Sequence, residues 1–518
     1  MIQVDSADFP RGPETRYECM RSVELQLDSL PEPHVASMLQ KLSNPGLVVC
    51  TDYSGLGQPE YALKRIQDWA YEKHACKSSV EFQRSGDLLP EACKVLAESS
   101  PRSTCVFGDM MKRMPKDINA KLNEILQRHR TEQELSMSAS VGRQAKQASK
   151  RASEKKYLAE AKKLILDEDP AVCTQWQSWC KKHKAMCHVH KFKGTGRGHI
   201  RMSIAGITCV DWSSRGIKKG TLGKSCMAFT AYMREVIHTL PDVVLLECVR
   251  QYQEGDAILM LEHNYHYTGL VFSPSEIGLP IERYRKFMVF LLRSGSGKEL
   301  KWKEGLQLCR GTFLAAFGRT KACNGHVFMD GTPDHCVSNA IAQKAAHKFM
   351  PPRDQFGRLW TFRDFLTEKT GCRIDKYERI LQSACSAKSS GRADDMAETE
   401  SGDEDASAPG SLGSWPVFCD ISQEPGFADI VANVPAFTRR NRIWSLEHNR
   451  HLLLEEAMEV MGVPAIMPAQ TLGLTAPWPE SKEELSESKV RALLGNSMQL
   501  TAIATVIVYI LAFTDEVE

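Results

Sequence analysis

The sequence predicts an α/β protein built on an open, mostly parallel sheet with helices on both faces. Residues 47–50 are apolar and lead into the glycine-containing YSGLG and then an amphipathic segment, which is typical of a strand, a tight turn and a helix. Two more apolar segments, SSVEF and STCVF, flank the helical pattern PEACKVLAES. RMSIAGI and DVVLLECV continue the alternation on either side of SCMAFTAYMREVIHTL, as expected for repeated β–α units.

Length and composition indicate a folded protein with reduced thiols. A chain of 518 residues has material for roughly two to four domains. Its 17 cysteines are scattered, and the first residues carry neither a basic start nor an apolar run, so we expect an intracellular protein. The apolar run at 500–513 is shorter than the ~20 residues of a membrane span, so we expect a buried terminal helix and no membrane partner.

Charge is balanced overall but unevenly distributed. The net charge is +2, from 66 basic and 64 acidic residues. Residues 112–201 hold 21 Lys and Arg against 9 Asp and Glu, which favours either a surface facing a polyanion or a solvated helical face. Residues 112–193 are therefore interpreted as a basic helical insertion. The stretch 386–414, rich in Ser, Gly, Ala and acidic residues, is expected to be a disordered loop.

The turn after the first strand is a candidate ligand site. Gly55 and Gly57 permit close approach of the backbone, and the following helix begins where negative charge is favoured. Glu81 and Asp109 are expected at the ends of the second and third strands, where carboxylates can bind ribose hydroxyls and an adenine amino group. The sequence therefore predicts a nucleoside pocket.

Cys209 lies on the loop after a buried strand, which is where an open α/β sheet presents chemistry. It is a candidate nucleophile, although free cysteines also fill space in protein cores. Glu247 is predicted at the end of the next strand as an acidic partner. Arg283 and Arg285 follow, and they could hold phosphate or base edges or cap the edge of the sheet.

A cluster of metal-binding residue types ends the basic insertion. Cys173, Cys180, His183, Cys187, His188 and His190 could supply a tetrahedral zinc site. Their spacing matches no zinc pattern, so the sequence assigns no metal and favours a basic helical hairpin anchored by tryptophan.

Taken in order, these motifs resemble the cytosine carbon-5 methyltransferase family over nearly the whole chain outside residues 1–44 and the insertion. YSGLG resembles that family's S-adenosylmethionine turn, and GITCVDWSSRG resembles its nucleophile loop. ECV, IERYR and LLGNSM stand where the family has ENV, QxRxR and GN(S). The resemblance implies a Rossmann-like S-adenosylmethionine-dependent methyltransferase sheet, with the cofactor held by Tyr53, Ser54, Gly55, Leu56, Gly57, Glu81, Asp109, Asn496 and Ser497.

The resemblance also implies a mechanism. Cys209 would add to carbon 6 of a flipped cytosine while Glu247 hydrogen-bonds or protonates ring nitrogen 3, and carbon 5 would then accept the methyl group. Four cations are candidates to favour the thiolate, namely Arg215, Lys218, Arg283 and Arg285, and Arg285 is also a candidate to position the base. Contacts to the DNA backbone are expected from the insertion and from Arg215, Lys218 and Lys219.

Three positions depart from the family pattern: Thr208 replaces a proline, Cys248 an asparagine and Ile281 a glutamine. The reacting groups remain, so we expect an active DNA (cytosine-5-)-methyltransferase in the nucleus, with DNA as its partner. Two alternatives stay open. One is the tRNA-methylating branch of the family, whose CFT tripeptide we do not find, and the other is an inactive nucleic-acid-binding regulator.

The same reading divides the chain into six parts. They are a leader with little structure (1–44), the cofactor part (45–111), the basic insertion (112–193), the nucleophile part (194–296), a target recognition region (297–440) and a C-terminal part of the catalytic domain (441–518).

Overall fold

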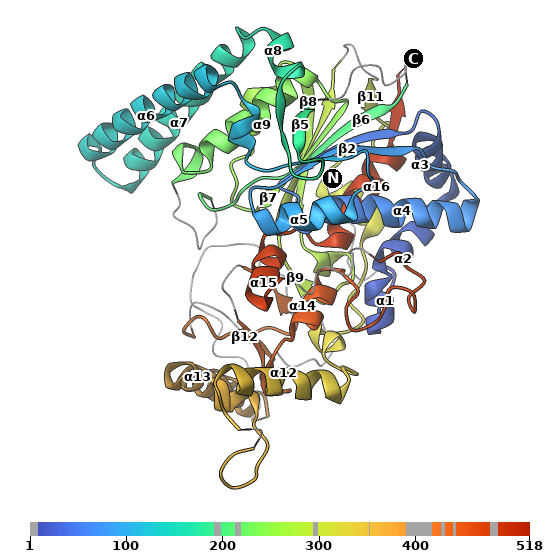
Figure 1. Ribbon diagram of the computed structural model, residues 1–518, viewed down its shortest axis with the longest axis vertical. Coiled ribbons are helices and arrows are strands. Elements are labelled where there is room, and N and C mark those ends of the chain that lie inside the picture. Colours follow the sequence, from blue (N-terminus) through green and yellow to red (C-terminus); the bar gives the residue numbers. More distant parts are fainter. Residues whose placement is uncertain are drawn as a thin grey trace.

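The computed structural model describes residues 9–190, 198–212, 219–293, 299–351, 353–389, 417–425, 430–438, 442–476 and 485–517. Within these residues nine strands form one sheet in the order β5-β4-β3-β2-β1-β6-β7-β10-β8 (Figure 1). The strands are β1 (Leu47–Asp52), β2 (Val80–Gly86), β3 (Cys105–Phe107), β4 (Gln177–Cys180), β5 (Ala185–His188), β6 (Ile200–Gly206), β7 (Val243–Val249), β8 (Tyr265–Phe272) and β10 (Arg285–Leu292).

The order of the strands makes this an open, doubly wound sheet. β3, β2, β1, β6 and β7 run parallel, whereas β10 runs antiparallel between β7 and the edge strand β8. In β7, Val243 and Leu245 join the core on one face, and Val244 and Leu246 join the core on the other. Strands that are apolar on both faces require helices on both sides, and the predicted α/β class is confirmed.

Helices cover the two faces as the apolar pattern requires. One core contains α2 (Ser22–Asp28), α3 (Glu32–Ser43), α4 (Gln58–His74) and α16 (Leu500–Phe513). The other contains α6 (Lys116–Ala139), α7 (Arg143–Leu166), α9 (Cys226–Thr239) and α10 (Gly255–Leu261), while α5 (Pro90–Ser99) packs beside β3.

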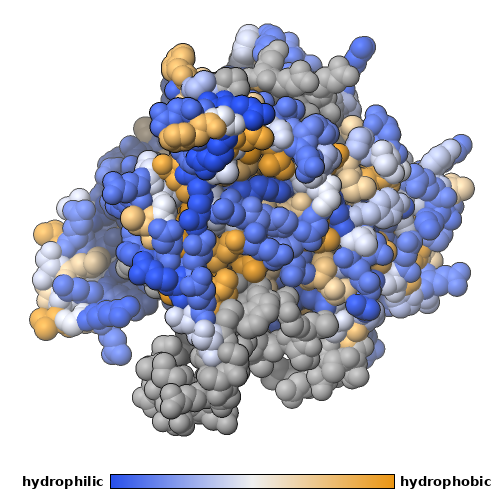
Figure 2. Space-filling model, turned by 90° about the horizontal axis from the view of Figure 1, so that it is seen from below, coloured by the Kyte–Doolittle hydropathy of each residue, from blue (hydrophilic) through white to orange (hydrophobic). Residues whose placement is uncertain are grey.

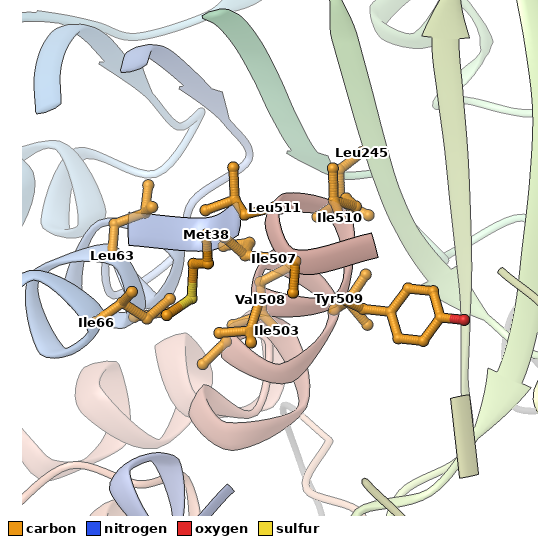
Figure 3. Close-up of a cluster of buried hydrophobic side chains, with 14 of the residues drawn as sticks. Met38, Leu63, Ile66, Leu245, Ile503, Ile507, Val508, Tyr509, Ile510 and Leu511 are labelled. Carbon is orange, nitrogen blue, oxygen red and sulfur yellow. The ribbon is translucent and has the colours of Figure 1, made fainter. Parts of the chain in front are cut away.

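The terminal helix α16 lies at the centre of the first core, and all of its residues are buried. Figure 3 shows Ile503, Ile507 and Leu511 of this helix among Met38 of α3, Leu63 of α4 and other apolar side chains. The segment Glu487–Phe513 is long and apolar enough to cross a membrane, but 94% of its most apolar window is buried inside the protein. The prediction of a buried terminal helix is confirmed.

The prediction of an unstructured leader at 1–44 is wrong. Residues 16–43 form α1 (Arg16–Met20), α2 and α3, because Thr15 and Glu18 make a capping box and Pro33 occupies the first turn of α3, where proline is tolerated. Glu24 of α2 accepts a hydrogen bond of 2.7 Å from Nε of the fully buried Arg65 in α4. Helices α2 and α3 are therefore part of the hydrophobic core on one face of the central sheet.

The basic insertion is helical only in its first part. Helices α6 and α7 pack together as an arm that projects from the sheet, followed by α8 (Pro170–Thr174) (Figure 1). The helical hairpin predicted for 173–194 is wrong, because residues 177–188 form the antiparallel strands β4 and β5. Cys180 pairs with Phe107 of β3, so this hairpin extends the central sheet.

The helices not yet described are α11 (Arg310–Phe317), α12 (Asp334–His347), α13 (Glu368–Ser389), α14 (Leu454–Val460) and α15 (Glu487–Asn496). The remaining short strands are β9 (Ile281–Glu282), β12 (Phe418–Asp420), β13 (Val434–Pro435), β14 (Ile443–Ser445) and β15 (Arg450–His451), and β11 (Leu300–Trp302) pairs with β16 (Thr514–Glu516). In Figure 1, β11 lies in the upper part of the molecule, whereas α12, α13, α14, α15, β9 and β12 lie in the lower part. Residues 386–389 of the predicted disordered loop belong to α13, and 390–414 lie outside the described residues.

Candidate active site

The turn between β1 and α4 is shaped by residues with left-handed backbone. Tyr53, Gly55 and Gly57 have φ of 54°, 57° and 77°. A Cβ on Gly55 would lie 2.6 Å from Ser497 Oγ, and the same hydroxyl accepts a 3.0 Å hydrogen bond from the backbone N–H of Leu56. Glycine is therefore required at 55, and the predicted turn residues contact Ser497 after α15.

Asp87 is a candidate site residue that the sequence interpretation missed. It follows β2 directly, and its Oδ2 accepts a 2.9 Å hydrogen bond from the N–H of Gly55. Its Oδ1 accepts one of 2.8 Å from Leu89. Asp87 therefore lies at the carboxyl end of β2, the position at which a carboxylate of such a sheet can bind ribose hydroxyls.

The placement of Glu81 at the end of the second strand is wrong. β2 runs from Val80 to Gly86, so Glu81 lies exposed at its beginning and pairs with Val48 of β1. The strand continues through Gln83, Arg84 and Ser85, whose polar side chains are nevertheless buried. The apolar segment predicted as this strand ends at Phe82, four residues before the end of β2, and the glycine-aspartate pair after Ser85 marks the true end of the strand.

Arg84 is buried because it belongs to a charge cluster beneath the glycine turn. Its guanidinium lies 2.8 Å from Asp52 and 2.7 Å from Glu235 of α9. Arg113 lies 2.6 Å from Asp52 and 3.4 Å from Glu235. Burial opposes the charge on Arg113, but the two carboxylates outweigh it and raise its pKa. Two cations and two anions thus fix the ends of β1 and β2.

The other predicted cofactor residues lie at the same edge of the sheet. Asp109 follows β3 and accepts a 3.0 Å hydrogen bond from Met111, so it caps the short helix Met110–Arg113. Asn496 ends α15 and is exposed, whereas Ser497 is buried. The structure therefore brings together the turn, Asp87, Asp109 and Ser497, and leaves Glu81 at the opposite edge.

The Cys209 loop is held on both sides. Ile207 donates a 2.8 Å hydrogen bond to the carbonyl of Glu247, and Trp212 donates one of 3.0 Å to the carbonyl of Cys209. The Trp212 ring packs 4.9 Å from that of Tyr252. Cys209 itself is partly exposed, as a nucleophile must be.

Of the three residues predicted individually to contact DNA (Arg215, Lys218 and Lys219), only Lys219 lies within the described residues. It is exposed and precedes the short helix Gly220–Leu222. Arg215 and Lys218 lie outside the described residues.

Glu247 is buried near the end of β7, opposite Gly206 in the register of β6. Its Oε1 lies 2.9 Å from Nε of Arg285, which begins β10. A Cβ on Gly206 would lie 3.5 Å from Glu247 Oε2, 3.2 Å from the carbonyl oxygen of Tyr53 and 3.0 Å from Met498 Cε. The carboxylate, the glycine turn and the segment after α15 therefore converge at Gly206.

Arg283 has a different environment from Arg285. It is buried, and it donates hydrogen bonds of 2.6 Å to the carbonyl of Ser497 and 3.1 Å to that of Phe437. Burial and then Arg285 lower its pKa to about 9, against the opposing effects of Glu247 and Cys209. Arg283 thus links β9 to the segments that hold Phe437 and Ser497, close enough to Cys209 for their charges to interact. This is the environment of a residue that positions neighbouring segments.

Two of the three residues that differ from the methyltransferase motifs, Cys248 and Ile281, are buried and pack against neighbouring segments. Cys248 is buried, and its thiol donates a 3.5 Å hydrogen bond to the carbonyl of Ile207 at the start of the Cys209 loop. Burial raises the pKa of Cys248, so it stays a neutral thiol. Ile281 is 2% exposed and belongs to the apolar core under α14 and α15, whereas Thr208 is partly exposed.

Comparison with known proteins gives only distant structural similarity. No family model and no curated protein sequence matches the chain. Among solved structures, the chain is similar to S. pombe Dnmt2 methyltransferase (13% identity, TM-score 0.36, covering 90% of this chain and 98% of that one). It is also similar to a putative prophage DNA modification methyltransferase from E. coli (12%, TM-score 0.37, 90% and 98%) and to Entamoeba histolytica EhMeth (12%, TM-score 0.36, 90% and 97%). Each of these three proteins is described as a methyltransferase.

Proposed function

We propose that this protein transfers a methyl group from S-adenosylmethionine to carbon 5 of cytosine in nuclear DNA. The observation that carries the proposal is the convergence at Gly206. There the glycine turn after β1 meets buried Glu247, and the loop holding partly exposed Cys209 begins three residues later. The candidate cofactor turn and the candidate nucleophile with its acidic partner therefore lie at the same edge of the sheet, which supports the proposal.

The residues present fit such a cofactor. Gly55 and Gly57 provide the left-handed backbone of the turn, and α4 begins directly after it, so its N-terminal amides favour a carboxylate. Asp87 and Asp109 place carboxylates at the ends of β2 and β3, where ribose hydroxyls and an amino group would be bound. When bound, S-adenosylmethionine would supply an electrophilic methyl group.

The chain's own groups supply the activation that cytosine requires. The Cys209 thiolate forms a bond to carbon 6 of the ring, and Glu247 donates a proton or hydrogen bond to nitrogen 3, where charge develops. Arg285, 2.9 Å from Glu247, fixes the orientation of that carboxyl group. After methylation, loss of the proton on carbon 5 and expulsion of the Cys209 thiolate restore the aromatic ring.

A base inside a duplex has to be flipped out of the helix to reach this edge of the sheet. The basic arm α6–α7 offers cations for the phosphate backbone. Between α12 and α13, Phe349 and Phe356 are 97% and 85% exposed, and the basic Arg353 and Arg358 lie close to them in the sequence. Exposed aromatic rings beside cations suit contact with unstacked bases.

The face seen from below in Figure 2 is mainly hydrophilic, with hydrophobic residues in small separate groups.

The test is covalent trapping. An oligonucleotide with 5-fluorocytosine, incubated with S-adenosylmethionine, should form an adduct with the wild-type protein that survives denaturation. Release of the thiolate requires loss of a proton from carbon 5, and the fluorine that replaces this hydrogen cannot be removed in the same way. Cys209→Ala should abolish the adduct, and Cys309→Ala, which removes an exposed cysteine outside the site, should keep it.

Absence of an adduct with wild-type protein that binds the cofactor would refute the proposal. Labelled methyl transfer to tRNA in preference to DNA would assign the tRNA substrate instead. Imaging of a tagged protein against a DNA stain tests the nuclear location.

A further inference from the structure

Three cysteines and one histidine meet at the edge of the sheet where the β4–β5 hairpin joins β3. Cys105 begins β3, Cys180 ends β4, His183 lies in the hairpin turn, and Cys187 is in β5. One ligand atom from each of these residues lies within 4.8 Å of all the others. None of the four belongs to the proposed active site.

The spacing of these atoms is that of a tetrahedral metal site. His183 Nδ1 lies 3.5 Å from Cys180 Sγ, 3.5 Å from Cys187 Sγ and 3.6 Å from Cys105 Sγ. A tetrahedral zinc ion with bonds of about 2.3 Å to sulfur and about 2.0–2.1 Å to nitrogen requires a nitrogen–sulfur separation of about 3.6 Å. All three separations agree with that value.

Groups around the cluster orient its ligands. His183 Nε2 lies 2.9 Å from the carbonyl oxygen of Arg102, and donation of its proton there leaves Nδ1 with the lone pair that faces the sulfurs. The backbone N–H groups of Val106 and His183 donate to Cys180 Sγ at 3.3 and 3.4 Å. Such bonds stabilise a thiolate, which is the form that binds metal.

The hairpin turn also balances charge. Three thiolates around a divalent ion leave one net negative charge, and Lys181, Lys182 and Lys184 surround His183 in the sequence. Lys182 Nζ donates hydrogen bonds of 2.6 and 2.7 Å to the carbonyls of Ser100 and Pro101, just before β3. The turn is thus attached to the same segment that supplies Arg102 and Cys105.

We infer that Cys105, Cys180, His183 and Cys187 bind one structural Zn²⁺ ion. Thiolate and imidazole ligands select zinc over magnesium or calcium, and four protein ligands leave no open position for catalysis. Binding replaces the three thiol protons, which pass to solvent, by three zinc–sulfur bonds.

This site differs from the one considered from sequence. Cys180, His183 and Cys187 were among the residues weighed there, but Cys105 lies far upstream and only the fold brings it to them. Cys173 and His190 lie apart from the cluster: His190 Nδ1 is 2.9 Å from Arg84, and its Nε2 is 3.8 Å from Cys173 Sγ.

The ion would fix the end of the helical insertion to the central sheet. It would link the beginning of β3, which leads to Asp109 at the cofactor pocket, with the hairpin that follows α6, α7 and α8. The arm would thereby be anchored to the sheet at a fixed position. Structural zinc sites contribute directly to folding free energy, so the hairpin would depend on the metal.

The test is metal analysis of the full chain, expressed with added zinc and purified without chelators. We expect about one zinc per chain. The double variant C180S/C187S should lose it, and C173S, which changes a buried cysteine outside the cluster, should retain it.

Replacement of zinc by Co²⁺ gives an independent readout in the wild-type protein. It should produce sulfur-to-cobalt charge-transfer absorption and the strong visible bands of tetrahedral cobalt. Less than a tenth of a zinc per chain together with no such spectrum would overturn the inference, as would full zinc retention by C180S/C187S.

Discussion

Asp87→Asn provides the sharpest comparison between the site in the structure and the site expected from sequence. The structure places Asp87 at the carboxyl end of β2, with Oδ2 2.9 Å from the N–H of Gly55. Glu81 lies five residues before Gly86, so at ~3.3 Å per residue it is roughly 16 Å from the pocket edge. Of these two carboxylates, only Asp87 can reach a ribose bound at the glycine turn.

The size of the effect follows from the bonds at stake. A hydrogen bond to a charged group contributes about 1.5–3 kcal/mol, and each 1.4 kcal/mol changes affinity about tenfold. Loss of one such bond in Asp87→Asn should weaken S-adenosylmethionine binding by about 10- to 100-fold. Glu81→Gln, the matched control, should change it by less than about twofold.

Isothermal titration calorimetry with S-adenosylmethionine measures both affinities, and thermal unfolding of each variant without ligand reports any change in stability. The reasoning is refuted if Glu81→Gln weakens binding as much as Asp87→Asn does. It is equally refuted if Asp87→Asn, still folded, binds the cofactor with unchanged affinity.

Three further outcomes are expected. Arg84→Met removes one of the two cations that neutralise buried Asp52 and Glu235, so it should lower the free energy of unfolding by about 3–5 kcal/mol in urea titration. Arg128→Met, at an exposed ion pair, should lower it by at most about 1 kcal/mol. Equal effects of the two changes would contradict the buried charge cluster. Burial would raise the pKa of Glu168, but hydrogen bonds from a histidine and an arginine of α9 lower it to about 2. Its stabilisation is therefore present above pH 4.5 and lost as the pH falls toward 2, and Glu168→Gln should flatten that part of the stability profile relative to wild type. Phe356→Ala should weaken binding of an unmethylated oligonucleotide several-fold in fluorescence anisotropy, by loss of about 1 kcal/mol or more of stacking, while Tyr71→Ala, on the exposed side of α4, should leave it unchanged.

The sequence predicted the elements whose local pattern agrees with their environment. The apolar β1, the turn with Gly55 and Gly57 and the amphipathic α4 follow one another without conflict, and the structure contains all three. Cys209 and Glu247 could be placed because each follows or ends a clearly apolar strand.

The errors arose where long-range contacts override local polarity. The apolar segment SSVEF ends at Phe82, but β2 continues to Gly86 because the charge of Arg84 is neutralised by Asp52 and Glu235 from distant segments. The segment expected to have little structure contains Pro33, but this proline stands in the first turn of α3, where its missing N–H costs nothing. The position of Cys105 beside the β4–β5 hairpin depends on strand pairing, which no local pattern specifies.

The place of α16 in the chain has a consequence for biosynthesis. Every strand of the central sheet precedes this helix, yet its side chains fill one of the sheet's two apolar faces (Figure 3). While the ribosome is still translating residues 500–513, the nascent polypeptide therefore carries an uncovered apolar sheet surface. Such surfaces are prone to aggregation, so we expect this chain to be most vulnerable to aggregation during its synthesis, before α16 can pack.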